Sequence, residues 1–261
     1  MVKTRFSAAF IHLCISALVV GSVAAVALFI WYPGLYFDMA GAQEPMLLII
    51  GIDLVIGPLL TLIVYRQGKP SLRFDLTVIA CLQIAALAYG TWALSSQRPM
   101  FLVFDRGNYE VVSAADIEGK NVPDEAATGM PFVGPKQVWA APSEDRALMM
   151  SVIIEGADDI FLLPEQYRPI TNAISGMKRS GHLVTDAYLA EHSDVAAALT
   201  AALNAEGMAI GDALGKRLYP VAGLRAERAA LTDPETAELM VMFDAQVPWV
   251  RPTLPAADAA E

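Results

Sequence analysis

The hydrophobic pattern of the first hundred residues consists of three long apolar runs. They cover Phe6–Tyr32, with no charged residue in 27 positions, Met46–Tyr65, whose only charge is Asp53, and Leu76–Gln97, with no charge in 22 positions. An α-helix needs about 20 mainly apolar residues to cross a bilayer, so each run is long enough. The pattern predicts a membrane module over residues 1–97, with helices at about 6–32, 46–65 and 76–97 in the lipid bilayer.

The first run also shares features with a cleavable signal peptide. Lys3 and Arg5 form a basic start, and Ala25-Val26-Ala27 resembles a cleavage site. The apolar run continues to Tyr32, however, whereas the apolar region of a signal peptide is typically about 7–15 residues long. We therefore expect the first run to remain as a membrane helix, with cleavage as the alternative.

After Gln97 the pattern changes to shorter segments separated by turn residues. It indicates a β-hairpin at 101–112, a surface loop at 119–145, a buried strand or short helix at 147–154, a helix at 186–203, and a closing hairpin made of 216–231 and 237–243. Prolines exclude regular structure from the tail, 247–261. Residues 98–261 are thus predicted to form a small α+β domain with an antiparallel sheet.

Composition and charge separate the same two parts. The chain is 55% hydrophobic and only 18% charged, whereas soluble domains carry about 25% charged residues. Residues 1–96 have a net charge of +1 and residues 97–261 carry −11, within a total of −10. This composition excludes a disordered chain, and the acidic balance argues against nucleic acid as a partner.

The basic residues near the apolar runs predict the orientation of the chain. They occur before the first run and between the second and third, at Lys3, Arg5, Arg66, Lys69 and Arg73. The loop at 33–45 has none. The positive-inside rule therefore places the N-terminus and the 66–75 loop in the cytoplasm, and three crossings export everything after Gln97. In a Gram-negative bacterium this is an inner-membrane protein with a periplasmic domain.

Asp53 is the most informative single residue, since an ionisable group in a membrane helix costs about 2.5–3.5 kcal/mol on insertion scales. Gly57 shares its helical face, and Pro58 should kink the helix. Counting 1.5 Å per residue from the centres of the runs puts Ser22 and Tyr89 at the level of Asp53. We therefore predict an intramembrane polar cluster of Asp53, Gly57, Pro58, Ser22 and Tyr89.

Two roles are open for the Asp53 carboxyl: a proton relay or binding group, or a cross-link within the three-helix bundle. Proton pathways need several ionisable groups, and no Glu, Lys or Arg accompanies Asp53 in the apolar runs. His12 lies about 15 Å closer to the cytoplasm by the helical rise, so the count does not pair it with Asp53. The structural role is the favoured one.

The exported part shows no constellation typical of catalysis or of cofactor or metal binding. The spacing of His182 and His192 does not put them on one helix face, and Gly176–Gly181 has the wrong spacing for a P-loop. The acidic pairs Asp158-Asp159 and Asp116/Glu118 do not follow a calcium-loop pattern. We expect a protein that is not an enzyme and that holds no cofactor and no metal.

Several stretches resemble the type IV pilin accessory proteins of the TfpX/TfpZ type. They are Trp31–Gly34, the D-x-x-x-G-P-L-L-T-L core within Gly51–Val64, Phe74–Leu76, Gln83–Gly90 and Arg98-Pro99. The similarity covers residues 5–118 and is loose beyond them. It implies an inner-membrane accessory factor that helps a cognate major pilin reach the surface as pili, and it carries over no catalytic residues.

Two other functions compete with a factor that binds or stabilises a pilin. The first is a membrane-tethered periplasmic sensor or ligand-binding protein. On the predicted orientation only a few N-terminal residues and one short loop face the cytoplasm, which leaves a sensor no output module. The second is a membrane enzyme that modifies pilin or envelope material, which the lack of catalytic motifs disfavours.

Overall fold

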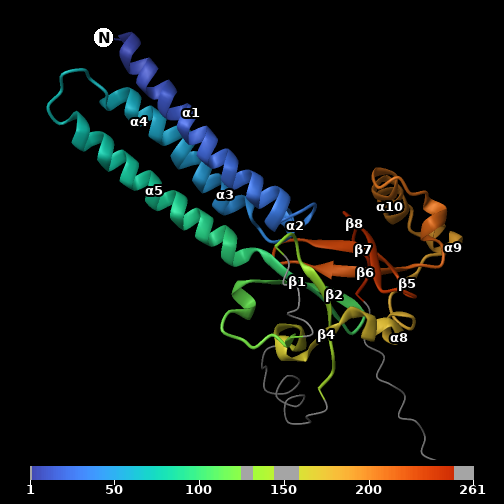
Figure 1. Cartoon of the computed structure of the whole chain (residues 1–261). Coiled ribbons are helices and arrows are strands. Elements are labelled where there is room, and N and C mark those ends of the chain that lie inside the picture. Colours follow the sequence, from blue (N-terminus) through green and yellow to red (C-terminus); the bar gives the residue numbers. More distant parts are fainter. Residues whose placement is uncertain (1, 125–131, 144–158, 250–261) are drawn as a thin grey trace, which may run out of the picture. The chain divides into compact units, whose positions relative to one another are not determined.

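A computed structural model describes residues 2–124, 132–143 and 159–249 (Figure 1). The chain divides into two compact units, Met1–Arg98 and Pro99–Glu261. The segment predicted at 147–154 lies outside the described residues, as does the tail from residue 250 onward.

The first unit contains three helical segments, as the apolar runs predict. The first is α1 (Val2–Val26) followed by the π-helix η1 (Ala27–Trp31); the second joins α3 (Gln43–Ile50), the π-helix η2 (Gly51–Ile56) and α4 (Gly57–Val64); the third is α5 (Leu72–Gln97). A short helix, α2 (Tyr36–Met39), lies in the first connection. Three stretches are long and apolar enough to cross a membrane, at Thr4–Trp31, Gln43–Val64 and Leu72–Gln97. The prediction of a three-helix membrane module is confirmed.

The distortion expected at Pro58 takes the form of a π-helical turn. Proline lacks an N–H group, and its ring collides with the preceding turn when it lies inside an α-helix. The backbone is π-helical from Gly51 to Ile56, and α4 begins at Gly57 with Pro58 in its first turn, so the wider turn precedes the proline ring. The second segment therefore continues across Pro58 without ending there.

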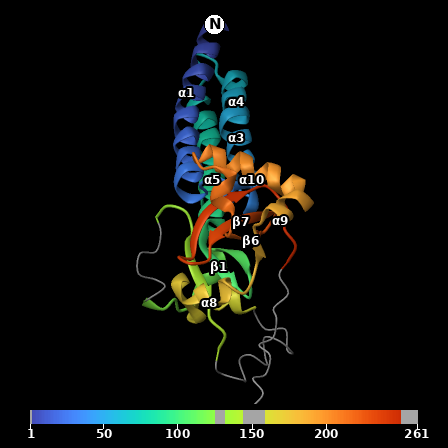
Figure 2. The same ribbon diagram turned by 90° about the vertical axis from the view of Figure 1, so that its right-hand side faces the viewer.

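The three segments run side by side, and close approaches join them (Figure 2). A Cβ atom added at Gly90 of α5 would lie 2.4 Å from Cγ1 of Ile49 in α3, so the missing side chain lets these helices touch. At the end of the first segment, the buried Tyr32 hydroxyl donates to the main-chain oxygen of Leu94. Such contacts bury backbone and polar groups that lipid would leave unsatisfied.

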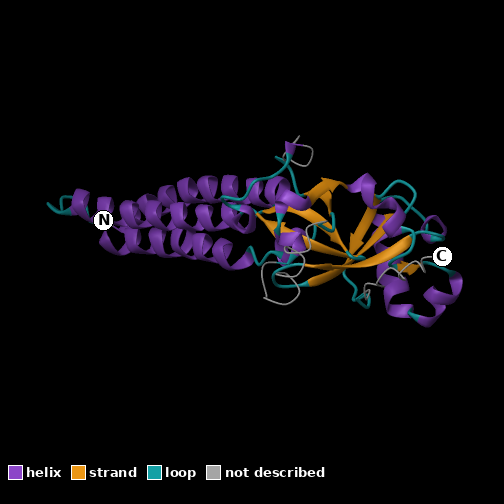
Figure 3. Cartoon of the chain, turned by 90° about the horizontal axis from the view of Figure 1, so that it is seen from below, coloured by secondary structure: helices purple, strands orange, loops and turns teal. Residues whose placement is uncertain are grey.

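The second unit is built on one curled sheet with the strand order β4-β3-β1-β2-β6-β7-β8, and β5 pairs with β6 (Figure 3). The strands are β1 (Pro99–Asp105), β2 (Asn108–Ser113), β3 (Lys136–Ala140), β4 (Tyr167–Pro169), β5 (His182–Leu183), β6 (Arg217–Ala222), β7 (Glu227–Asp233) and β8 (Glu238–Phe243). The α+β class is confirmed. The prediction of an antiparallel sheet is corrected, because β1 pairs with β3 and β2 with β6 in parallel, while the other pairs are antiparallel. The prediction of a surface loop over 119–145 is also wrong in part, because β3 lies within it.

Three α-helices of the second unit lie between β4 and β6 in the described part of the chain. They are α8 (Ile174–Met177), α9 (Asp186–Glu191) and α10 (Ser193–Ala205). The single helix predicted over 186–203 is therefore broken at His192, and the Thr185 hydroxyl caps α9 by accepting from the Tyr188 N–H. The apolar face of α10 packs on β6, β7 and β8 through Val195, Leu199 and Leu203, which form a hydrophobic core with these strands. A second cluster of buried residues involves β1 and β3.

The two predicted hairpins are present, with one change. The β1–β2 turn places Arg106 at φ 47° and Gly107 at φ 93°, as a tight two-residue hairpin requires. The segment predicted as one strand over 216–231 is instead two strands, β6 and β7, because the chain turns where the Gly223 N–H donates to the Ala226 oxygen. The closing hairpin is therefore β7–β8.

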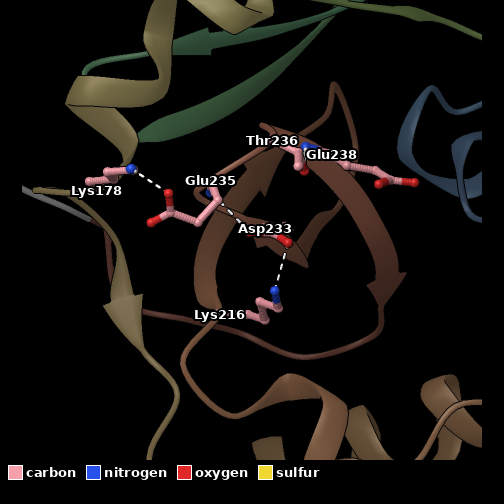
Figure 4. Close-up of polar contacts among 6 residues, drawn as sticks. All are labelled: Lys178, Lys216, Asp233, Glu235, Thr236 and Glu238. Atoms are coloured by element: carbon pink, nitrogen blue, oxygen red, sulfur yellow. Dashed lines mark hydrogen bonds and ion pairs between the residues drawn. The ribbon is translucent and has the colours of Figure 1, made fainter.

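The turn between β7 and β8 is held by two lysines from other parts of the second unit (Figure 4). The Asp233 carboxylate accepts from Lys216 Nζ at 2.6 Å and from the Glu235 N–H at 2.9 Å. Lys178, which follows α8, forms an ion pair with Glu235. The Lys216 hydrogen bond, helped by the Glu235 N–H, lowers the pKa of Asp233. These polar contacts give the acidic turn a structural role.

Candidate functional site

The three membrane segments together contribute four buried polar side chains. These are Ser16 from α1, Asp53 from η2, Thr61 from α4 and Gln83 from α5. Polar groups inside a membrane helix usually face protein, because lipid satisfies no hydrogen bond. The four side chains make this part of the bundle the candidate site.

Two hydrogen bonds connect the segments around Asp53. His12 Nδ1 of α1 lies 2.6 Å from the Thr61 hydroxyl of α4. Gln83 Nε2 of α5 donates to the main-chain oxygen of Asp53 at 3.4 Å. A Cβ atom at Gly57 would lie 2.2 Å from this same Nε2 atom, so glycine at position 57 is what admits the Gln83 amide. The sequence count does not find these partners of the cluster.

The Asp53 carboxyl itself is only partly satisfied. Asp53 is 5% exposed, and its Oδ2 atom has no hydrogen-bond partner among the residues that the structure describes. A buried polar atom without a partner carries the full desolvation cost of that group, about 1–3 kcal/mol or more for a charge. Most buried side-chain polar atoms are paired, so an exception of this kind indicates a function or an absent partner.

A cleft of about 180 Å³ lies beside Asp53, and we call it the Asp53 cleft. Its polar lining comes from His12, Ser16, Asp53 and Gln83, and apolar side chains of α1 and α5 complete it. These residues sit near the middle of the membrane segments. Asp53 is next to the midpoint of Gln43–Val64, and Ser16 and Gln83 are within two residues of the midpoints of Thr4–Trp31 and Leu72–Gln97.

The structure does not bring Ser22 or Tyr89 to Asp53, so this part of the predicted cluster is corrected. The Ser22 hydroxyl is exposed and donates to the Leu18 oxygen of its own helix at 2.8 Å. Tyr89 is 58% exposed and lies against Trp92 with ring centroids 5.9 Å apart. Both side chains are exposed, and neither lines the Asp53 cleft. Pro58 is buried, and its effect is on the backbone, since it lies in the first turn of α4 after the π-helical turn.

The second unit brings its two histidines to one aromatic stack. The Tyr188 ring lies between them, stacked on His192 at 4.3 Å and tilted toward His182 at 5.9 Å. Within the described ranges, no group of three or more His, Cys, Asp or Glu side chains is arranged to hold a metal ion. Asp116 accepts from the Ser113 N–H and hydroxyl, which gives this acidic residue a structural role, and Asp158 lies outside the described residues.

Glu110 of β2 should make the free energy of unfolding depend on pH. Burial raises its pKa from 4.5 to about 7, with added repulsion from Asp105, Asp159 and Glu227. Because the native state binds this proton more tightly than the unfolded chain, the free energy of unfolding falls as the pH rises through this range. We expect Glu110→Gln to stabilise the protein by about 1–2 kcal/mol at pH 8 and by little at pH 4.5, after allowance for solvent screening.

The measurement is denaturant unfolding of the full-length protein at both pH values. The matched control is Glu206→Gln, at an exposed carboxylate that follows α10. A gain for Glu110→Gln that is equal at pH 4.5 and pH 8 contradicts the buried-carboxyl explanation.

Comparison with known proteins places the chain in a family. A fimbrial assembly protein of Dichelobacter nodosus, serogroups C1 and C2, is 33% identical over 109 residues, which is 41% of this chain and 83% of that relative. The chain belongs to the fimbrial assembly protein FimB family. The model of this family matches residues 1–41. The match therefore includes His12 and Ser16 of the Asp53 cleft.

Longer FimB relatives are matched only in part. The serogroup I protein of the same organism is 34% identical over 109 residues, and the serogroup E1 protein is 33% identical over 109 residues. The match covers 42% of the length of each, so the chain aligns with less than half of these relatives. No solved structure matches the chain. These findings support a family related to type IV pilus assembly and do not single out the TfpX/TfpZ type.

Proposed function

We propose that this FimB-family protein is an inner-membrane accessory factor for the assembly of type IV fimbriae, and that it binds or stabilises a cognate pilin before or during assembly. The observation that carries the proposal is the identity of 33–34% over 109 residues with proteins named for fimbrial assembly. Three membrane helices and a separately folded domain are compatible with this role, since a pilin awaiting assembly has a membrane helix and an exported head.

Deletion of the gene tests the proposal. In a strain that makes fimbriae, we expect the deletion to reduce surface fimbriae while pilin transcripts persist, because the factor acts on the subunit after its synthesis. Electron microscopy and a quantified surface-pilin immunoblot give the readout. A plasmid copy of the gene should restore the fimbriae, and a non-cognate pilin should relieve the dependence. Normal fimbriation in the deletion strain would remove the accessory role.

The orientation of the membrane module is part of the same proposal. Alkaline phosphatase fused after Arg98 should be active, and the same enzyme fused at Gly68, in the turn between α4 and α5, should be inactive. The reason is that basic residues lie beside Gly68, at Arg66, Lys69 and Arg73, and the positive-inside rule keeps this loop in the cytoplasm. Immunoblots normalise the activity to fusion level. The opposite pattern of activity reverses the topology.

A further inference from the structure

A groove of about 640 Å³ runs between α1, α4 and α5 at one end of the membrane module, and we call it the α1–α4 groove. It is lined by residues of α1 from Thr4 to Ile15, by Thr61 and Tyr65 of α4, and by Leu76 of α5. The start of α1, the end of α4 and the start of α5 lie together at this end of the bundle (Figure 1). Clefts that bind ligands have volumes of about 300–1,000 Å³, so the groove is large enough for a ligand.

The groove presents mainly carbon surface to a ligand. Ile11 is 60% exposed there, and other apolar side chains of α1 and α5 adjoin it. The polar side chains of the lining are engaged: His12 is bonded to Thr61, and Thr4 and Ser7 also have partners. A hydrocarbon chain therefore fits this lining better than a polar ligand does.

The length of the groove matches the acyl-chain region of one lipid leaflet. Along α1 it extends from Thr4 to Ile15, which is about 16 Å at a rise of 1.5 Å per residue. The hydrocarbon core of a bilayer is about 30 Å thick, so this length is roughly half of it. Thr4, Val64 and Leu72 are the ends of the three membrane spans at this end of the bundle, so the groove runs from the membrane surface toward the bilayer centre.

Three arginines lie at the mouth of the groove. Arg5 and Arg66 each follow a residue that lines the groove, and Arg73 lies one helical turn before a third lining residue, on the same helix face. None of the three arginine side chains forms an ion pair within the described part of the chain, whereas the nearby Asp75 is already paired with Lys69. The mouth therefore carries a positive charge that attracts an anion.

We propose that the α1–α4 groove binds an acyl chain of an anionic phospholipid, whose phosphate group lies among Arg5, Arg66 and Arg73. An apolar groove of one leaflet's length with unpaired cations at its mouth is complementary to this class of lipid in both shape and charge. Basic pockets between membrane helices are known to bind anionic headgroups in this way. The inference goes beyond the proposed function and does not depend on a pilin.

Another membrane helix suits the groove less well. By the positive-inside rule, a helix that ends on this side brings its own basic residues to the same depth, where the three arginines repel them. A second copy of this chain would bring the same three arginines. An anionic phospholipid brings the opposite charge, and each basic residue near the surface strengthens its binding about fivefold.

Photo-cross-linking of the full-length protein in vesicles tests the proposal without a substitution. The probe is phosphatidylglycerol with a diazirine in one acyl chain, kept at a fixed low mole fraction, and mass spectrometry locates the adducts. When the host lipid is changed from phosphatidylcholine to phosphatidylglycerol, adducts in the groove should fall about tenfold, because the unlabelled anionic lipid competes for the site. Adducts at Leu18, an exposed residue of α1 outside the groove, should not change, since the surrounding lipid there is not selected by its headgroup.

Ile11→Trp tests the apolar part of the site, and Leu18→Trp is its matched control. Both substitutions place the same large side chain on α1 at an exposed position and start from side chains of equal size, but only Ile11 lines the groove. We expect Ile11→Trp to lower the groove adducts about tenfold in phosphatidylcholine, because the indole occupies the space of the acyl chain. Leu18→Trp should leave the groove adducts unchanged.

The arginines are tested by combining Arg66→Gln with Arg73→Gln. Loss of two guanidinium groups should reduce the effect of the host lipid on the groove adducts from about tenfold to about twofold or less. Lys3 and Lys69 remain at this end and keep the orientation of the helices. The control is Arg98→Gln, which makes the same charge change at the other end of α5 and should retain the full effect of the host lipid.

Several results would overturn the proposal. Groove adducts that do not respond to the host lipid, or that respond only as those at Leu18 do, mean that ordinary surrounding lipid fills the groove. Retention of the groove adducts in Ile11→Trp contradicts the assigned site. If the adducts ignore the host lipid but disappear when a pilin is reconstituted with the protein, the groove belongs to a membrane helix. The effect of gene deletion on fimbriae is a separate readout, so the accessory function stands or falls independently of the lipid site.

Discussion

Replacing Gly90 with leucine is expected to lower the amount of the protein in the membrane several-fold. The added side chain starts from a Cβ position 2.4 Å from Ile49 Cγ1 and 3.5 Å from the Pro45 oxygen, and Ile49 is fully buried between the helices. Overpacking of this kind costs about 1–3 kcal/mol, and losses of 1–2 kcal/mol already change cellular abundance several-fold. Immunoblots of membrane fractions and thermal unfolding in detergent measure the effect.

Gly21→Leu is the control for the Gly90 prediction. Gly21 also lies inside a membrane helix, α1, but no atom comes within 4 Å of a Cβ built there. Both substitutions add the same apolar side chain and the same gain in helix propensity. The difference between them isolates the contact between α3 and α5. If Gly21→Leu lowers the protein level as much as Gly90→Leu does, that contact is not the reason.

The sequence predicts the membrane helices well because length and hydropathy alone determine them. It predicts the partners of Asp53 poorly, partly because the helices do not begin where the apolar runs begin. The spans begin about two to four residues before the apolar runs do, at Thr4, Gln43 and Leu72, because polar residues join the first turns. When the midpoints of the observed spans are used, the residues of α1 and α5 at the depth of Asp53 lie roughly one helical turn earlier in each helix, close to Ser16 and Gln83.

The remaining error concerns the face of the helix. Ser16 and Ser22 are six residues apart, as are Gln83 and Tyr89. At 3.6 residues per turn, six residues place a side chain about a third of the circumference away. Ser22 and Tyr89 are therefore exposed while Ser16 and Gln83 are buried. The burial of Ser16 and Gln83 depends on which neighbour each helix packs against, and the even apolarity of the runs does not reveal it.

In the second unit, local signals predict local structure and fail at distant pairings. Turn residues indicate both hairpins, and the apolar spacing of Val195, Leu199 and Leu203 indicates the helix that covers the sheet. The parallel pairing of β2 with β6 joins Tyr109 to Val221 across more than a hundred residues, and no local pattern encodes it. The same holds for the stack of His182, Tyr188 and His192, which forms because β5 pairs with β6 immediately before α9.

Replacing Gly181 with alanine is expected to destabilise the second unit by about 2–4 kcal/mol. Gly181 precedes β5 with φ +73°, a conformation that costs other residues about 1–2 kcal/mol. Its new methyl group would also lie 2.5 Å from Tyr219 Cε1 and 2.9 Å from the Leu218 oxygen. The Tyr219 ring cannot retreat easily, because it is fully buried and its hydroxyl donates to the Met177 oxygen at 2.8 Å. Overpacking adds about 1–3 kcal/mol.

Gly207→Ala separates the steric part of this effect from the conformational part. Gly207 follows α10 with φ +74°, nearly the φ value of Gly181, but no atom lies within 4 Å of a Cβ built there. Alanine at position 207 should therefore lose only the conformational term, about 1–2 kcal/mol. Hydrogen exchange of the β6 amides in the full-length protein measures both variants. Equal losses would mean that the backbone conformation alone accounts for the cost, and that the contact between Gly181 and Tyr219 contributes nothing to the stability of the sheet.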